Sequence, residues 1–157
     1  MTWIPVASLA DVYAARDRHR GLESESEGTP LSLFATLDGR VFAIATACPH
    51  GGHRLSRGHA LDPTDIEDLA QFGAPFVSCP AHAYLYDVAT GECVSSFGGG
   101  PGRCRVFATR VVGDRVYASA AETPATELGS LGHLPIETRN AIGLRSVDLA
   151  LKARYGE

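Results

Sequence analysis

The stretches CPHGG at residues 48–52 and CPAH at residues 79–82 decide how the rest of this sequence is interpreted. Each places a thiol and an imidazole one or two residues apart, in a Pro-containing loop that follows an expected strand. A thiolate and an imidazole so close along the chain can point from one loop toward the same small volume. Two such loops supply four ligands, and the pattern therefore indicates a metal centre held by Cys48, His50, Cys79 and His82.

The segments around these loops are short, apolar and separated by turn signals. The clearest pair is LSLFATL at 31–37 and RVFAIATA at 40–47, joined by Asp38-Gly39, a dipeptide that tolerates positive φ. Further strands are expected within residues 74–79, 83–88, 103–112 and 115–120. Short strands at hairpin spacing predict an all-β fold, an antiparallel sandwich or barrel.

The two ends of the chain have helical patterns. Ser8 is a good N-cap, and apolar residues at helical spacing follow it, so a short surface helix is expected within residues 8–20. The next ten residues, GLESESEGTP, predict a solvated loop because they combine Gly, Pro and three glutamates. Residues 121–157 return to a helical pattern, which we interpret as a C-terminal helical extension.

Length, charge and composition limit the classes of protein to consider. A chain of 157 residues is about one domain long and can bury a proper core. Its net charge of −4 argues against nucleic acid as a partner, and no apolar run is long enough to suggest a membrane span. The N-terminus lacks the charge cluster and apolar run of a signal sequence, so a reducing, cytoplasmic location is expected.

The two Cys/His motifs resemble the ligand pattern of the Rieske iron–sulfur proteins, Cys-x-His followed by Cys-x-x-His. The similarity extends to CPHGGHRLSRG, SCPAHAYLYDVATGE and GGGPG, covers about residues 31–120, and is greatest with the soluble Rieske-type ferredoxins. It implies a Rieske-like antiparallel β-sandwich with a small cluster-binding subdomain at about 46–102, in a domain of residues 1–120. Relative to the shortest members, this chain has an insertion within residues 60–75.

The resemblance also implies the cofactor, one [2Fe-2S] cluster, and the division of its ligands. Cys48 and Cys79 would bind one iron, and His50 and His82 would bind the other through one ring nitrogen each. Two neutral imidazoles in place of two thiolates make the cluster less negative, which raises the potential from about −400 mV into the range of roughly −150 to +300 mV. The second ring nitrogens are expected to face solvent, where electrons leave and reduction couples to protonation.

The family also places particular residues beside the cluster. The matching positions here are Gly51, His53, Pro80, Tyr84, Tyr86 and Pro101. Tyr86 matches a Tyr whose hydroxyl donates to a ligand sulfur, which raises the potential, whereas Tyr84 stands where high-potential members have a Ser donor. His53 and Ala81 replace the cysteines of a loop-tying disulfide in those members. We therefore expect an intermediate-to-low potential.

Several residues have a second interpretation. Two Cys and two His also satisfy structural zinc, although zinc modules usually pair Cys with Cys and His with His. Cys93 and Cys104 are expected to be inert core thiols, with a disulfide between them as the alternative. His59 is expected to be solvated, and His53 is either solvated or a spare ligand or proton relay. The acidic residues Asp62, Asp65, Glu67 and Asp68 either steer a basic partner or are simply solvated.

The function that we expect is one-electron transfer from a reductase to a terminal oxygenase or reductase, with no catalysis by the chain itself. A Rieske oxygenase catalytic subunit would need a second domain with a two-His, one-carboxylate iron site, and only His133 follows residue 120. The alternative is a non-catalytic subunit that resembles the small subunit of nitrite reductase, in which the ligands are often missing. A monomer is expected, with dimerisation through residues 121–157 as the alternative.

Overall fold

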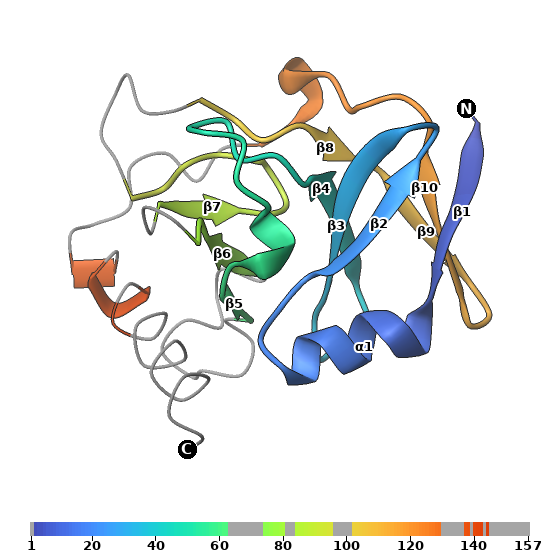
Figure 1. Cartoon of the computed structure of the whole chain (residues 1–157), viewed down its shortest axis with the longest axis horizontal. Helices are drawn as coiled ribbons and strands as arrows, with labels where there is room; N and C mark the ends of the chain where they lie inside the picture. The colour runs from blue at the N-terminus through green and yellow to red at the C-terminus, as the bar shows by residue number, and fades with distance from the viewer. Residues whose placement is uncertain are drawn as a thin grey trace.

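The computed structural model describes residues 2–62, 74–80, 84–95 and 102–129, together with 137–138, 140–142 and 144. Its strands form three sheets, in each of which all pairings are antiparallel (Figure 1). In sheet order these are β1 (Trp3–Ser8), β10 (Arg115–Ser119) and β9 (Thr109–Val112); then β2 (Leu22–Ser26), β3 (Thr29–Ala35), β4 (Val41–Ala45) and β8 (Val106–Phe107); then β5 (Ala60–Leu61), β6 (Phe76–Ser78) and β7 (Leu85–Asp87). The prediction of an antiparallel all-β fold is confirmed.

Helical segments are few and short among the described residues. The longest α-helix in the described ranges is α1 (Leu9–Asp17), and η1 (Leu55–Arg57) and η4 (Ala125–Glu127) are 3₁₀ turns. The expected N-cap of α1 is confirmed, because the Ser8 hydroxyl accepts a hydrogen bond from the Asp11 amide at 3.2 Å. None of the helices in the described part of the chain is long and apolar enough to cross a membrane.

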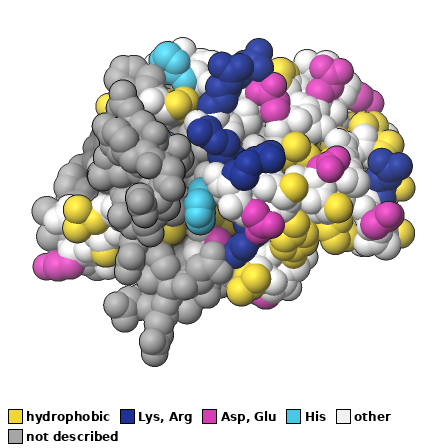
Figure 2. All heavy atoms as spheres, turned by 60° about the horizontal axis from the view of Figure 1, so that its bottom comes forward, with side chains coloured by type: hydrophobic (Ala, Val, Ile, Leu, Met, Phe, Trp, Pro, Cys, Tyr) yellow, Lys and Arg dark blue, Asp and Glu magenta, His cyan; other side chains and the backbone are white. Residues whose placement is uncertain are grey.

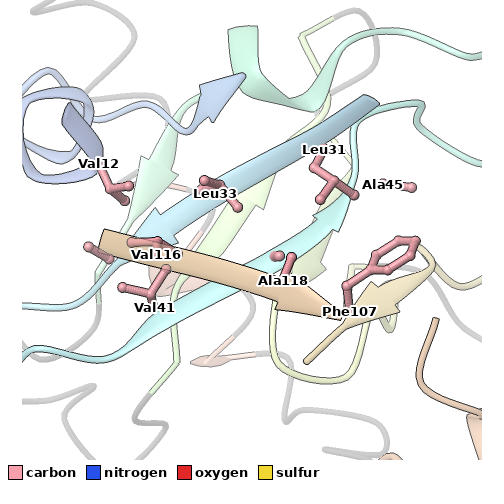
Figure 3. Packing of buried hydrophobic residues seen from close by; sticks show 10 residues of the cluster. Val12, Leu31, Leu33, Val41, Ala45, Phe107, Val116 and Ala118 are labelled. Carbon is pink, nitrogen blue, oxygen red and sulfur yellow. The ribbon is translucent and has the colours of Figure 1, made fainter. Parts of the chain in front are cut away.

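Strands β3 and β4 bury side chains on both faces of their sheet. Since side chains alternate between the two sides of a strand, the two faces carry different residues. One face carries Leu31, Leu33, Ala35, Val41, Ala43 and Ala45. These side chains pack against Val12 of α1 and Val116 and Ala118 of β10, which makes the first core (Figure 3). The sandwich therefore closes over this face.

The opposite face of the same strands forms a second core. Phe34 of β3 and Ile44 of β4 lie on this face, and they pack with residues of the third sheet and of the loops beside it. The members from those segments are Cys48, Leu55, Val77, Cys79, Tyr86, Val88 and Cys104, and β8 adds Val106. The candidate ligand cysteines are thus part of the hydrophobic interior and not of a surface loop alone.

The expectation of a solvated loop over GLESESEGTP is wrong. Residues Leu22–Ser26 form β2, which pairs with β3 from Leu22 opposite Leu33 to Ser26 opposite Thr29. The glutamates alternate with less exposed residues, which is the period of a strand with one solvated face. Glu27 and Gly28, both with positive φ, form the turn. The acidic residues suggested a loop, but their spacing of two was the signal of a strand.

The insertion begins from an anchored residue. Asp62 is buried and accepts hydrogen bonds from the Arg16 guanidinium at 3.1 and 3.3 Å and from the Leu37 amide at 2.9 Å. Both interpretations of the acidic run, steering and simple solvation, are therefore wrong for Asp62. Asp65, Glu67 and Asp68 lie outside the described residues.

The first part of the C-terminal extension packs onto the second core. The Thr123 amide donates to the Val106 carbonyl at 2.7 Å, and Leu128 contacts the buried cluster. Farther on, the described residues between 137 and 144 are helical, with Ile142 fully buried and Leu144 70% exposed. The rest of the expected helical tail lies outside the described residues.

The turn after β7 is pressed against the segment before β8. The Cys104 amide donates to the Gly91 carbonyl at 2.8 Å, and Gly91 has a φ of +75°. A Cβ added at Gly91 would lie 2.2 Å from the Cys104 carbonyl oxygen. Gly113, in the β9–β10 turn, has a φ of +61° but nothing within 4 Å of an added Cβ. A substitution at Gly113 would therefore introduce backbone strain alone, whereas one at Gly91 would add a steric clash.

We expect Gly113→Ala to lower the free energy of unfolding by about 1–2 kcal/mol, because a left-handed conformation is strained in any residue with a Cβ. Gly91→Ala should lose about 1–3 kcal/mol more, since the backbone must also move apart. Urea unfolding followed by circular dichroism measures both changes. Equal losses for the two variants would show that the contact with Cys104 relaxes without cost.

Candidate metal centre

The loop that follows β4 carries the first motif and is closed by its own backbone. The Cys48 amide donates to the His53 carbonyl, and the Gly52 amide donates to the Cys48 carbonyl, both at 2.8 Å. The Leu55 amide then donates to the Thr46 carbonyl at 2.8 Å, which closes the base of the loop. Gly52 has a φ of +74°, which supplies the sharp turn. The loop thus holds Cys48 at a fixed position at the end of a buried strand.

The second motif has the same arrangement at the end of β6. The Cys79 amide donates to the Tyr84 carbonyl at 2.8 Å, directly beyond the pairing of Ser78 with Leu85. Pro80 is exposed at the start of this loop. His82 lies outside the described residues, as does Pro101.

A close backbone approach holds the two loops together. The Ser78 amide donates to the His59 carbonyl at 3.0 Å, one residue before Cys79. At Gly58, which ends η1, an added Cβ would lie 1.8 Å from the Ser78 carbonyl oxygen. Only glycine fits this crossing, and its φ of −76° shows that space and not backbone conformation is the reason. The sequence contained no signal of this contact beyond the glycine itself.

Both candidate ligand thiols are buried. Cys48 and Cys79 are each 2% exposed and belong to the second core. The Tyr86 hydroxyl oxygen lies 3.2 Å from the Cys48 sulfur. A thiolate can only accept a hydrogen bond, so Tyr86 is the donor whenever Cys48 is a ligand. This arrangement agrees with the donor role that the resemblance implied for Tyr86.

Tyr86 keeps its proton because of its surroundings. The side chain is fully buried, and this burial raises the pKa of Tyr86, with the hydrogen bond to Cys48 raising it further. The hydroxyl is therefore available as a donor throughout the physiological pH range.

The imidazole side of the site is at the surface. His50 is exposed, and its ring centroid lies 4.8 Å from that of Tyr84, with the two planes tilted by 56°. Gly51 and His53 are exposed on the same loop. The site is therefore asymmetric, with thiols in the core and the described imidazoles in contact with solvent.

These residues fit an iron–sulfur cluster with ligands on separate irons. Within the part of the chain that the structure describes, no three His, Cys, Asp or Glu side chains gather closely enough to hold one metal ion. A two-iron cluster with a Cys₂His₂ set does not require such a gathering, because the thiolates bind one iron and the imidazoles bind the other.

The two remaining cysteines do not belong to the motifs. Neither Cys93 nor Cys104 forms a disulfide, so the alternative of a disulfide between them is wrong for this structure. Cys104 is buried, as expected, and burial raises its pKa, with the neighbouring thiols of Cys48, Cys93 and Cys79 adding to the effect. Cys93 is only half-buried, and its sulfur lies 3.7 Å from the Ser95 hydroxyl. Cys104 is therefore an inert thiol, and Cys93 sits nearer to solvent than expected.

His59 differs from the expectation of a solvated side chain. It is half-buried, and desolvation lowers its pKa, with the charges of Arg20 and His19 lowering it further. The cause is the pairing of β5 with β6, which draws the His59 backbone into the fold beside Ser78.

The comparison with protein families decides the identity of the centre. The Rieske [2Fe-2S] domain matches residues 2–101. The chain belongs to this family. A Rieske domain carries one [2Fe-2S] cluster on two Cys and two His ligands and transfers electrons, so the zinc interpretation loses its support.

Solved structures agree on the fold of this Rieske domain. NdmB of Pseudomonas putida CBB5 is 23% identical with a TM-score of 0.61, and the match covers 76% of this chain and 34% of that chain. A putative NADH-dependent nitrite reductase small subunit from Mycobacterium tuberculosis is 21% identical, with coverages of 74% and 93% and a TM-score of 0.59. A chain from the complex of oxygenase and ferredoxin in carbazole 1,9a-dioxygenase is 23% identical, with coverages of 78% and 96% and a TM-score of 0.58.

This Rieske chain therefore spans about a third of the length of NdmB and nearly the whole of the other two chains. At these identities the likeness establishes the fold alone. No curated protein sequence matches the chain.

Removing the Tyr86 hydroxyl tests its effect on the centre. If Tyr86 donates to a ligand sulfur, it stabilises the more negative, reduced state, so Tyr86→Phe should lower the potential. A net hydrogen bond to a charged acceptor is worth about 1.5–3 kcal/mol, and about 59 mV corresponds to roughly 1.4 kcal/mol for one electron. We expect a fall of several tens of millivolts, measured by protein-film voltammetry at fixed pH.

Tyr84→Phe is the matched control, because it removes a hydroxyl beside His50 and keeps the ring contact. Its potential should hardly change. A shift of less than about 15 mV in Tyr86→Phe, worth about 0.35 kcal/mol, would mean that the hydroxyl does not act on the cluster.

Proposed function

We propose that the chain is a one-electron carrier, a Rieske-type ferredoxin, that accepts electrons from a reductase and delivers them to a terminal oxygenase or reductase. The observation that carries this proposal is the asymmetry of the centre, in which Cys48 and Cys79 are buried while His50 is exposed. Buried thiolates retain the cluster, and an imidazole at the surface gives the electron a short path to a partner protein.

In the same proposal, Cys48 and Cys79 bind one iron, and His50 and His82 bind the other. The bound cluster supplies one reversible electron at a potential above that of all-cysteine clusters. The second core excludes water from the thiolates, and Tyr86 withdraws electron density from the Cys48 sulfur. Gly58 lets the two ligand loops approach closely enough to share the cluster.

We further propose a division of the chain into the Rieske domain at residues 1–120 and an extension at 121–157. The contacts of Thr123 and Leu128 with the second core support an extension that packs onto its own domain, and hence a monomer. We also propose a cytoplasmic location, because cysteines that form no disulfide, such as Cys93 and Cys104, are typical of a reducing compartment.

The second candidate function is that of a non-catalytic subunit in a larger redox complex. The observation that favours it is the match to two nitrite reductase small subunits along 93% and 100% of their length. The complete Cys and His motifs favour the carrier. Kinetics separate the two, because a carrier shows saturable reduction by a free reductase, whereas a permanent subunit co-purifies with its partner.

The ligand assignment predicts which substitutions abolish the cluster. Holoprotein should be red-brown and, once reduced, give an EPR signal whose average g value is below that of all-cysteine clusters. Cys48→Ser, Cys79→Ser, His50→Ala and His82→Ala should each lose this signal, since each removes one bond to iron. Absorption, EPR and iron content measure the outcome.

Cys93→Ser and Cys104→Ala are the matched controls, and both should retain the cluster. Loss of the cluster in Cys93→Ser would show that the ligand assignment is wrong. Equimolar zinc without iron in the purified protein would overturn the carrier function itself.

A further inference from the structure

A shallow hollow lies between the two ligand loops. Its volume is about 450 Å³, and the described residues that line it are Gly52, His53, Arg54, Arg57 and Pro80. Gly52, His53 and Arg54 belong to the first loop or follow it directly. Arg57 is the last residue of η1, and Pro80 follows Cys79 on the second loop. We call this feature the loop hollow. It is adjacent to the surface at which the centre meets solvent.

The loop hollow is basic in a chain whose net charge is −4. None of its described lining residues is acidic. Arg54 is neutralised by Glu23, with 2.8 Å between its Nη1 and the Glu23 Oε2. Arg57 is exposed, and no described carboxylate pairs with it. The excess charge therefore comes from Arg57.

A second arginine, Arg20, lies beyond the end of α1 and lines a neighbouring hollow, but it is held next to the loop hollow. Arg20 donates from its Nη1 to the Arg57 carbonyl at 2.6 Å, so its guanidinium is held beside the same turn. Desolvation lowers the pKa of His59, and the charge of Arg20 lowers it further. Figure 2 shows one face of the molecule on which Lys and Arg side chains gather in a band beside the undescribed residues.

The groove next to the loop hollow carries charges of both signs. A larger groove of about 620 Å³ shares Gly52 and Arg54 with it but continues along β2. That groove is also lined by Glu23 and Glu25, which offset the charges of Arg54 and Arg105. An acidic ligand would therefore be attracted to the end of this surface that lies next to the metal centre.

We propose that the loop hollow docks a carboxylate-rich face of the redox partner protein, with Arg57 and Arg20 as the attracting charges. This inference rests on the carrier function proposed above and names the chemistry of its partner. Guanidinium groups match carboxylates through two parallel hydrogen bonds, and complementary charge accelerates encounter at low salt. Docking here brings a carboxylate face of the partner next to the loop that carries His50.

Small redox reagents of opposite charge test the attraction without an identified partner. Reduced holoprotein is oxidised in a stopped-flow instrument by ferricyanide, an anion, and by tris(1,10-phenanthroline)cobalt(III), a cation. The variants are R20Q/R57Q and, as the matched control, R110Q/R115Q, which removes two charges from β9 and β10. These strands lie on the opposite side of the molecule from β6 and β7 (Figure 1).

At about 10 mM ionic strength, R20Q/R57Q should react with ferricyanide about three- to tenfold more slowly than the wild type and with the cobalt complex faster. The difference should vanish near 1 M salt, where the Debye length is about 3 Å. R110Q/R115Q should change both rates by less than about twofold. Equal effects of the two double variants would overturn the proposal, because only net charge would then matter.

A ten-residue oligoglutamate serves as a stand-in for the acidic face. At low salt it should slow ferricyanide oxidation of the wild type and of R110Q/R115Q, and leave R20Q/R57Q unaffected. Inhibition of all three proteins to the same extent would place the acidic ligand elsewhere. The EPR signal and the potential of each variant are measured first, so a failure of docking with an intact one-electron couple is distinguished from a failure of the carrier function.

Discussion

Strands β3 and β4 have no solvent face, and this double burial organises the molecule. Their odd-numbered residues pack under α1 and the β1–β10–β9 sheet, while Phe34 and Ile44 pack toward the metal centre. A slip of one residue in register would exchange the two sets of side chains. The pairing of Leu31 with Ala45 through Ala35 with Val41 thus maintains the sandwich and the floor of the site at once.

The centre built on that floor has two chemically different sides. The thiol side is buried, and the Tyr86 hydroxyl lies 3.2 Å from the Cys48 sulfur there. The imidazole side is exposed at His50 and adjoins the loop hollow, which Arg57 lines and Arg20 flanks. In the proposed function, the potential would be adjusted on the thiol side and partner docking on the imidazole side, so either property could change while the other is kept.

Much of this arrangement was predictable because it is encoded in local patterns. Asp38-Gly39 between two apolar runs predicted the β3–β4 hairpin, which the structure confirms. The spacing of Cys and His predicted the loops that begin at Cys48 and Cys79, and the assignment of the four ligands stays a prediction. Strand β2 was not predicted, because its acidic composition is typical of a solvated loop. The alternation of exposed and less exposed residues along it is nevertheless the period of a strand. The buried pair of Asp62 with Arg16 was not predictable, because it joins residues 46 positions apart that no local pattern connects. The same holds for Gly58 against Ser78, a contact that depends on the final crossing of two backbones.

The anchoring of the inserted segment bears on how this protein can diverge. Asp62 is fixed by Arg16 and the Leu37 amide, and the Pro75 carbonyl accepts from the Val88 amide at 3.1 Å. Both ends of this segment are therefore tied to the sandwich through contacts with residues that lie outside the segment. Because Arg16 belongs to α1, sequence changes in that helix and the point at which the inserted segment leaves the sandwich are coupled, so the two regions are expected to diverge together.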